Sequence, residues 1–97
     1  MGWIIEFEPR VEKDLRALDL TGRRRVIAFL RERIAPLQNP RSLGEPLRGE
    51  KSGKFWKYRV GNYRIICIIQ DEVIKILVVR VGHRKEIYRQ IPRMVES

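Results

Sequence analysis

Three basic side chains lie close together in the segment FWKYRVGNYRIICII, which spans residues 55–69. Two β-favouring runs flank the Gly-Asn pair at 61–62, and a two-residue turn of this kind predicts a β-hairpin. The turn sets the register, so Arg59 lies opposite Arg64. Because side chains alternate between the faces of a strand, Lys57, Arg59 and Arg64 share one face, which we call the basic face. Like charges opposite one another weaken a sheet, and we therefore expect this face to hold an anion.

The residue types of the chain exclude several kinds of site. A single histidine and a single cysteine cannot assemble an ordinary zinc site. The sequence contains neither a phosphate-binding GxxxxGKS/T loop nor a GxGxxG dinucleotide motif. We expect no acid to neutralise the cations of the basic face. No pair of carboxylates falls on it either, which argues against glycosidase or two-metal nuclease chemistry. We therefore expect no metal and no cofactor, and a site built from arginine, lysine and tyrosine.

Such a site suits the cleavage of RNA by its own 2′-hydroxyl, a reaction that needs no external nucleophile. Arginine presents paired donors that match phosphate oxygens, so it can position the phosphate and stabilise the charge of the phosphorane. A lysine or tyrosine among arginines has its pKa lowered, because neighbouring cations disfavour protonated lysine and favour the phenolate. Either group could then exchange protons nearer neutrality. DNA lacks the hydroxyl, so this chemistry implies an RNA substrate.

The chain as a whole is basic, with a net charge of +9 over 97 residues and a pI near 10.4. This surplus indicates a polyanionic partner, either nucleic acid or an acidic protein. The length corresponds to one domain, residues 1–97, and we expect the single cysteine, Cys67, to be a buried structural thiol. No signal peptide and no apolar run of about 20 residues is present, so the sequence predicts a cytoplasmic protein with no membrane partner.

A strand and two helices are expected before the hairpin. Residues 3–8 are β-favouring, Pro9 suits the first position of a helix, and Thr21 is the expected N-cap of a second helix. That helix ends before Pro36 and carries an apolar stripe made of Val26, Ile27, Leu30 and Ile34. Residues 38–46 form a turn-rich loop. We expect both helices to pack on the face of the sheet opposite the basic face.

A second turn is expected at Asp71-Glu72, followed by a third strand. If Gln70 pairs with Val73, Ile66 lies opposite Leu77. This register adds Lys75, Leu77 and Val79 to the basic face, and Ile74, Ile76 and Val78 to the apolar face. A short helix between residues 85 and 95 completes an α+β fold: an N-terminal strand, a helical hairpin packed on one face of an antiparallel β-meander, and a short C-terminal helix.

With this order of elements the sequence resembles the RelE/ParE superfamily of toxin–antitoxin toxins. The likeness rests on three motifs taken together: Pro-Leu-Arg-Gly before the hairpin, Lys-x-Arg-x-Gly-x-Tyr-Arg within it, and Val-Gly-His-Arg-x-x-x-Tyr after it. It covers the chain from Trp3 to Tyr88 and implies a RelE-type toxin that cleaves mRNA in the ribosomal A site without a metal. The implied partners are a cognate antitoxin, with which the toxin forms a hetero-oligomer, and the ribosome with its mRNA.

The resemblance also implies roles for residues at matching positions. Arg64 matches the arginine that binds the scissile phosphate, and Arg84 matches an arginine assigned to phosphate stabilisation or leaving-group protonation. Tyr88 matches a tyrosine that orients a base and helps to activate the 2′-hydroxyl, and Lys57 matches a strand lysine near the attacking group. Arg48 matches a substrate-binding arginine. The expected RNA-binding set is completed by Arg59, Lys54 and His83.

The chain departs from the RelE pattern at Phe55, where a second lysine is common two residues before Lys57. Lys54 points to the opposite face in a regular strand, and His83 is a further candidate for the proton acceptor because histidine exchanges protons near neutrality. The identity of the base is therefore open. Two alternatives to the ribonuclease remain: a ParE-like toxin that inhibits DNA gyrase without nuclease activity, and a non-catalytic module that binds RNA or the ribosome.

Overall fold

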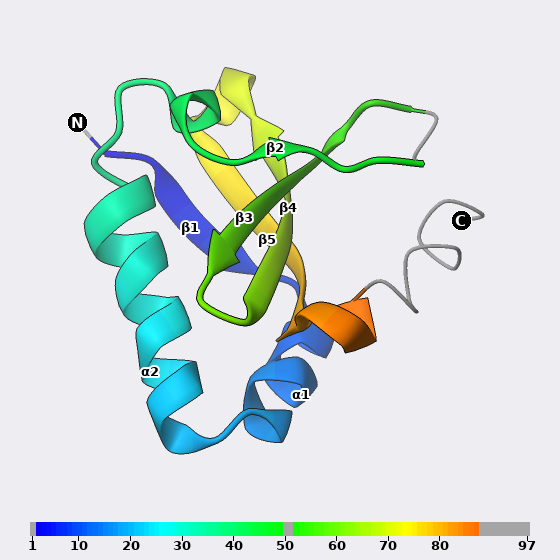
Figure 1. Ribbon diagram of the computed structural model, residues 1–97. Helices are drawn as coiled ribbons and strands as arrows, with labels where there is room; N and C mark the ends of the chain where they lie inside the picture. Colours follow the sequence, from blue (N-terminus) through cyan, green and yellow to red (C-terminus); the bar gives the residue numbers. More distant parts are fainter. Residues whose placement is uncertain (1, 50–51, 88–97) are drawn as a thin grey trace.

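A computed structural model of the protein describes residues 2–49 and 52–87 (Figure 1). Its strands form one mixed sheet in the order β1-β5-β4-β3-β2. The strands are Ile4–Phe7 (β1), Glu45–Pro46 (β2), Phe55–Val60 (β3), Tyr63–Gln70 (β4) and Lys75–His83 (β5). β1 runs parallel to β5, and the remaining neighbours are antiparallel. A helical hairpin follows β1 and a helical turn begins at residues 84–87 after β5, so the predicted fold class is confirmed.

The two helices of the hairpin, α1 (Pro9–Ala17) and α2 (Leu20–Ala28), lie along one side of the sheet (Figure 1). Pro9 opens α1 as expected. The prediction that Thr21 caps the second helix is wrong, because the helix begins earlier and Asp19 is its N-cap. The Asp19 carboxylate accepts a hydrogen bond of 2.6 Å from the N–H of Gly22. Its negative charge also suits the positive end of the helix dipole, an advantage that a threonine hydroxyl lacks.

The second helix continues beyond Ala28 as a π-helical segment, Phe29–Ile34, and ends just before Pro36. Within it the N–H of Ala35 donates to the carbonyl of Leu30 at 2.8 Å. Val26, Leu30 and Ile34 are spaced by four residues, which is more than the roughly 3.6 residues of one α-helical turn, so in a regular α-helix they would rotate gradually around the axis. A π-helical turn contains more residues and therefore reduces this rotation. Of the stripe predicted from the sequence, Val26, Leu30 and Ile34 are fully buried, whereas Ile27 is only half-buried and lies outside the core cluster.

The central hairpin has the position and register that its Gly-Asn turn predicts. Arg59 pairs with Arg64, and Lys57 pairs with Ile66. The register predicted for β4 and β5 is wrong, since Gln70 pairs with Lys75 rather than with Val73. Asp-Glu lacks the glycine that a tight primed turn prefers.

A longer connection replaces that turn. It is made of a 3₁₀ turn at Asp71–Val73 and of Ile74, which adopts a φ of 52°. The shift of two residues preserves the alternation of faces, so Ile76 and Val78 face the helices as predicted. Ile74 does not join them and is 45% exposed. A bulge beside Ile66 and Cys67 then moves the register by one more residue, and Ile66 pairs with Arg80 instead of Leu77.

Buried apolar side chains form two clusters, one on each side of the sheet. The larger lies under the helices and includes Tyr58, Val60, Ile65, Cys67, Ile76, Val78 and Val81. The smaller lies on the side of the basic face and consists of Leu47, Phe55, Ile66, Val79 and Ile87. Ile87 belongs to the helical turn after β5, so the start of the C-terminal helix covers part of the aliphatic area beside the cations. Cys67 is fully buried, as expected, and burial raises the pKa of its thiol to about 12.

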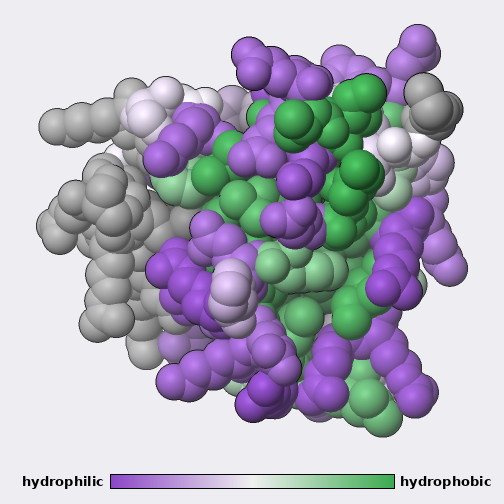
Figure 2. Space-filling model, turned by 180° about the vertical axis from the view of Figure 1, so that it is seen from behind, coloured by the Kyte–Doolittle hydropathy of each residue, from purple (hydrophilic) through white to green (hydrophobic). Residues whose placement is uncertain are grey.

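Some large apolar side chains remain on the surface. Figure 2 shows hydrophobic residues gathered over the middle of one face, with hydrophilic residues around them. The exposed side chains Ile4, Val73 and Ile74 come from β1 and from the connection before β5, and the N–H of Ile4 donates to the carbonyl of Ile74 at 2.9 Å. Among the residues that the structure describes, no helix is long and apolar enough to span a bilayer.

Candidate functional site

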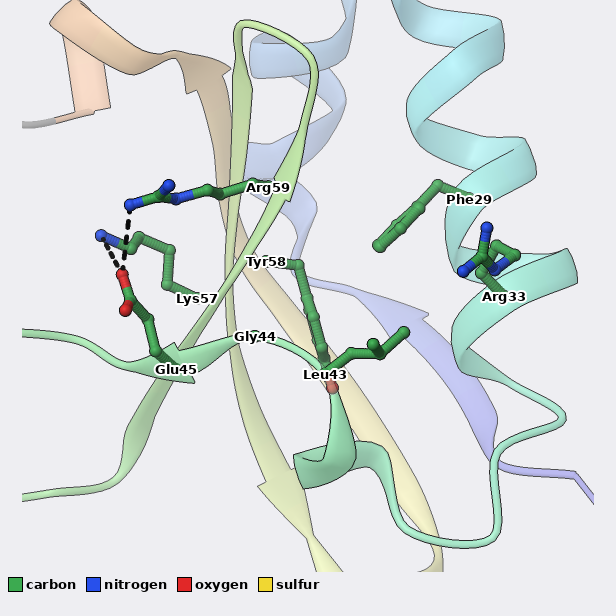
Figure 3. Close-up of a pocket in the computed structure, with 8 residues that line it drawn as sticks. All are labelled: Phe29, Arg33, Leu43, Gly44, Glu45, Lys57, Tyr58 and Arg59. Atoms are coloured by element: carbon green, nitrogen blue, oxygen red, sulfur yellow. Dashed lines mark ion pairs between the residues drawn. The ribbon is translucent and has the colours of Figure 1, made fainter.

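The basic face carries a carboxylate that the sequence analysis did not anticipate. Lys57 is only 4% exposed, and its Nζ lies 3.1 Å from Oε1 of Glu45 (Figure 3). The same oxygen lies 3.6 Å from Nη2 of Arg59, whose side chain projects into solvent. The expectation that no acid reaches this face is therefore wrong for Lys57 and Arg59.

Glu45 reaches the face because the loop before the hairpin forms an extra edge strand. β2 pairs Glu45 with Lys57 and Pro46 with Trp56. The indole N–H of Trp56 donates to the carbonyl of Leu43 at 2.9 Å and fixes the approach of the loop. Gly44 permits that approach, since it has a φ of +79° and a Cβ there would lie 2.5 Å from the carbonyl oxygen of Lys57. Proline is tolerated in an edge strand, so Pro46 with Gly44 shortly before it was the one feature of the sequence that could have indicated this strand.

Arg64 is the cation of this face that no described carboxylate contacts. It is 7% exposed, and its Nη1 donates to the carbonyls of Gly61 at 3.0 Å and Tyr63 at 2.9 Å. Its Nε is buried and has no hydrogen-bond partner among the described residues. A buried donor without a partner costs about 1–3 kcal/mol. An anion that approached this guanidinium would supply the missing acceptor.

Arg84 lies at the same end of the sheet as Arg64. The backbone N–H of Arg84 donates to the carbonyl of Asn62 in the hairpin turn at 2.8 Å. Arg64 pairs with Gly82 on β5, two residues before Arg84. The Arg84 side chain is exposed. The structure thus brings the two predicted catalytic arginines to one turn, whereas Tyr88 lies outside the described residues.

The predicted RNA-binding residues are only partly gathered. Arg48 is exposed in the turn after β2 and contributes to the lowered pKa of Glu45, so it acts on the same site. Lys54 places its Nζ 5.1 Å from the centre of the Phe55 ring. His83 pairs with Tyr63, and their rings meet edge to face at 6.4 Å on the helix side of the sheet. The sheet therefore separates His83 from the side chain of Arg64.

The electrostatics of the site centre on Glu45. Its hydrogen bond to Lys57 is the main cause that lowers the pKa of the Glu45 carboxyl, with smaller contributions from the charges of Lys57, Arg59 and Arg48. Glu45 is therefore ionised at neutral pH and offers an acceptor beside several donors. Within residues 2–49 and 52–87, no three His, Cys, Asp or Glu side chains are grouped so that they could hold a metal ion.

Comparisons with known proteins agree with this architecture. The family model described as the ParE toxin of the type II toxin–antitoxin system parDE matches residues 5–88. The toxin RelG of Mycobacterium tuberculosis is 32% identical over 90 residues, which are 93% of this chain and all of RelG. The mRNA interferase toxin RelE of Escherichia coli is 28% identical over 97 residues, with 98% and 99% of the two chains covered.

Solved structures show the same fold. The toxin–antitoxin complex RelBE2 of Mycobacterium tuberculosis contains a chain that matches with a TM-score of 0.76 and 25% identity, over 86% of this chain and 99% of that one. The RelB–RelE antitoxin–toxin complex of Methanococcus jannaschii matches with a TM-score of 0.61 and 28% identity, over 86% and 94% of the chains. With a family model that spans most of its length, this chain belongs to the ParE toxin family of type II toxin–antitoxin systems, within the RelE/ParE superfamily.

Proposed function

We propose that this toxin is a metal-independent endoribonuclease that cleaves mRNA in the ribosomal A site by attack of the 2′-hydroxyl. The observation that carries the proposal is the buried guanidinium of Arg64, which no described carboxylate contacts and whose Nε lacks an acceptor. A phosphate is the ligand that suits an arginine of this kind. Support also comes from the relative in Escherichia coli, which is named an mRNA interferase.

In the proposed reaction the 2′-oxygen attacks phosphorus and the 5′-oxygen leaves, so the products are a 2′,3′-cyclic phosphate and a free 5′-hydroxyl. Arg64 and Arg84 stabilise the charge that develops on the phosphorane, and the leaving 5′-oxygen takes a proton from solvent water to become the 5′-hydroxyl. The ionised carboxylate of Glu45 takes the proton of the 2′-hydroxyl, and the ammonium of Lys57 at 3.1 Å supplies positive charge next to the attacking oxygen. For Tyr88 we propose the role that the resemblance implies, which is to orient a base and help to activate the 2′-hydroxyl.

The experiment uses ribosomes stalled on a defined mRNA with an empty A site. Wild-type toxin is expected to cut the message within the A-site codon with no divalent metal added beyond the Mg²⁺ that keeps the ribosome assembled. Arg64→Ala and Arg84→Ala should each lower the rate by about 10²–10³-fold, as loss of a charge-stabilising donor does elsewhere. Arg24→Ala removes an exposed arginine from α2 and is the matched control, which should cleave at the wild-type rate. Cleavage that survives Arg64→Ala would refute the proposed site.

A second candidate function is inhibition of DNA gyrase, because the matching family model is that of the ParE toxin. It predicts that the protein blocks supercoiling by purified gyrase while the mRNA on stalled ribosomes stays intact. That result would replace the ribonuclease proposal. If the protein binds RNA in a salt-dependent manner but neither cleaves it nor inhibits gyrase, a non-catalytic binding module is the remaining function.

We also propose that a cognate antitoxin neutralises this toxin by covering the basic face with acidic side chains. The relatives solved as toxin–antitoxin complexes support such a partner, and the net charge of +9 favours an acidic one. Co-expression with the protein encoded by the adjacent gene should restore growth and yield a stable complex on gel filtration. Failure of that protein to bind would refute the assignment.

A further inference from the structure

A groove of about 350 Å³ opens beside the basic face, around the edge of β3 (Figure 3). On one side it is lined by Phe29 and Arg33 of the π-helical segment, and the ring of Phe29 points toward the sheet. On the other side lie Lys57 and Arg59, so the groove is continuous with the candidate site. Phe29 and Arg33 are four residues apart, and this spacing places both on the side of the helix that faces the groove.

The lining of the groove combines positive charge with an apolar floor. Arg33, Lys57 and Arg59 provide three cations, and Glu45 is the carboxylate among the lining residues. The floor contains Tyr58, whose hydroxyl donates to the carbonyl of Pro40 at 2.6 Å. Tyr58 is fully buried, so neither its ring nor its hydroxyl is open to a ligand. The ring of Phe29 meets the Tyr58 ring edge to face, with 6.0 Å between ring centres.

The edge of β3 is uncovered where the groove runs. The N–H of Leu47 donates to the carbonyl of Phe55, so every second residue of β3 from Phe55 directs its backbone groups outward. β2 covers only the stretch up to the pair of Glu45 with Lys57. Arg59 is the next residue whose backbone faces outward, and within the described part of the chain no strand pairs with it there. The edge of β3 at Arg59 is therefore left for a ligand to approach.

We propose that single-stranded RNA leaving the basic face passes around this edge through the groove, with one phosphate on Arg33 and one base against the ring of Phe29. Cations interleaved with aromatic rings suit single-stranded nucleic acid, because phosphates pair with arginine and bases stack on rings. The inference rests on the proposed function, since the RNA is the one held by Arg64. RNA is favoured over an acidic peptide because the cationic residues of the groove continue into the proposed cleavage site along one path.

The test measures RNA binding, so that its outcome is separate from that of the cleavage assay. The probe is a fluorescein-labelled octanucleotide of 2′-O-methyl RNA, which cannot be cleaved because the attacking hydroxyl is blocked. Fluorescence anisotropy gives its Kd for the full chain at several salt concentrations. Arg33→Ala should weaken binding roughly three- to tenfold and lower the salt slope by about 0.7, which corresponds to one phosphate contact on a single strand.

Two further variants make the result specific to the groove. Arg31→Ala removes an exposed arginine from the same helical segment but outside the groove, and its Kd should stay within about twofold of the wild type. Phe29→Leu keeps an apolar side chain against Tyr58 and should weaken binding about fivefold without changing the salt slope, because a stacked base is lost and no phosphate contact. Circular dichroism checks that each variant is folded.

Each other outcome bears on the inference. Equal effects of Arg33→Ala and Arg31→Ala would overturn it, because the groove would then contribute no more than any surface arginine. If Arg33→Ala weakened binding of a labelled poly-glutamate peptide but not of the RNA, the groove would belong to an acidic protein and the inference would also fail. If the wild type cleaves mRNA but Arg33→Ala does not change the Kd for RNA, the groove inference is refuted and the proposed function is not. If Arg33→Ala weakens RNA binding but the wild type does not cleave mRNA, the proposed function is refuted and the groove inference is not.

Discussion

Gly44→Ala tests how the acid of the site is brought to the basic face. Gly44 has a φ of +79°, and an added Cβ would lie 2.5 Å from the carbonyl oxygen of Lys57 and 2.6 Å from Nε1 of Trp56. Both of these atoms are held in place, the first in a strand and the second by its hydrogen bond to Leu43. The loop must therefore retract, and Glu45 would move away from Lys57 with it.

The magnitude follows from two separable costs. A non-glycine residue in the left-handed region costs about 1–2 kcal/mol. Relief of the overlap by displacement of packed atoms costs about a further 1–3 kcal/mol, part of which is the lost hydrogen bond of Trp56. Gly49→Ala isolates the first cost, because Gly49 has a φ of +80° but no described atom within 4 Å of its would-be Cβ. The effect on the unfolded chain is the same for both variants and cancels in the comparison.

Urea unfolding of both variants, followed by tryptophan fluorescence, measures the difference. With a slope of roughly 1 kcal/mol per molar urea for a domain of this size, Gly44→Ala should unfold about 1–3 M earlier than Gly49→Ala. We expect Gly44→Ala also to lose cleavage activity where it remains folded, since Glu45 no longer lies beside Lys57. Equal urea midpoints for the two variants would show that the added Cβ at position 44 causes no costly overlap with Lys57 and Trp56, and would refute the reasoning.

Three other changes have outcomes that the contacts predict. Asp19→Ala should lower the free energy of unfolding by about 0.5–2 kcal/mol, because it removes the cap of α2, whereas Thr21→Ala should change urea stability less. Because the pKa of Glu45 is lowered from 4.5 in the folded state, its stabilising effect is complete above about pH 4.5 and is lost as the pH falls through the folded-state pKa. Glu45→Gln should therefore flatten the acid side of a plot of melting temperature against pH, and an unchanged acid side would contradict the lowered pKa. Ile74→Asn should leave thermal stability unchanged or raise it by about 1 kcal/mol, since asparagine tolerates positive φ; a lower melting temperature would mean that the Ile74 side chain contributes more packing than its exposure indicates.

The central hairpin could be predicted because its information is local. Two turn residues fix the pairing of Arg59 with Arg64, and the alternation of strand residues then assigns every neighbour to a face. The faces predicted for Ile76 and Val78 were also right although their register was wrong. An error of two residues leaves the alternation intact, whereas an error of one would have reversed it.

The features that could not be predicted depend on contacts distant in the chain. The bulge in β5 moves Val81 to the helix side, and nothing in the local sequence indicates where an extra residue is inserted. The pairing of Glu45 with Lys57 joins a loop to a strand, and its two-residue strand is too short to leave a periodic pattern. His83 was predicted to be an RNA-binding residue and a candidate proton acceptor, but cross-strand pairing with Tyr63 places its ring on the other side of the sheet from Arg64.

The carboxylate of Glu45 divides the cations of the basic face into two groups with different capacities. Lys57 and Arg59 already have an anionic neighbour, so an incoming phosphate must compete with it for them. Arg64 has no such neighbour in the described residues and keeps a buried N–H unpaired. Anion binding should therefore centre on Arg64, beside the hairpin turn to which Arg84 is tied. Lys57 and Glu45 form an ion pair, to which the proposed reaction assigns the proton transfer from the 2′-hydroxyl, and this division follows from one strand pairing that the sequence alone does not reveal.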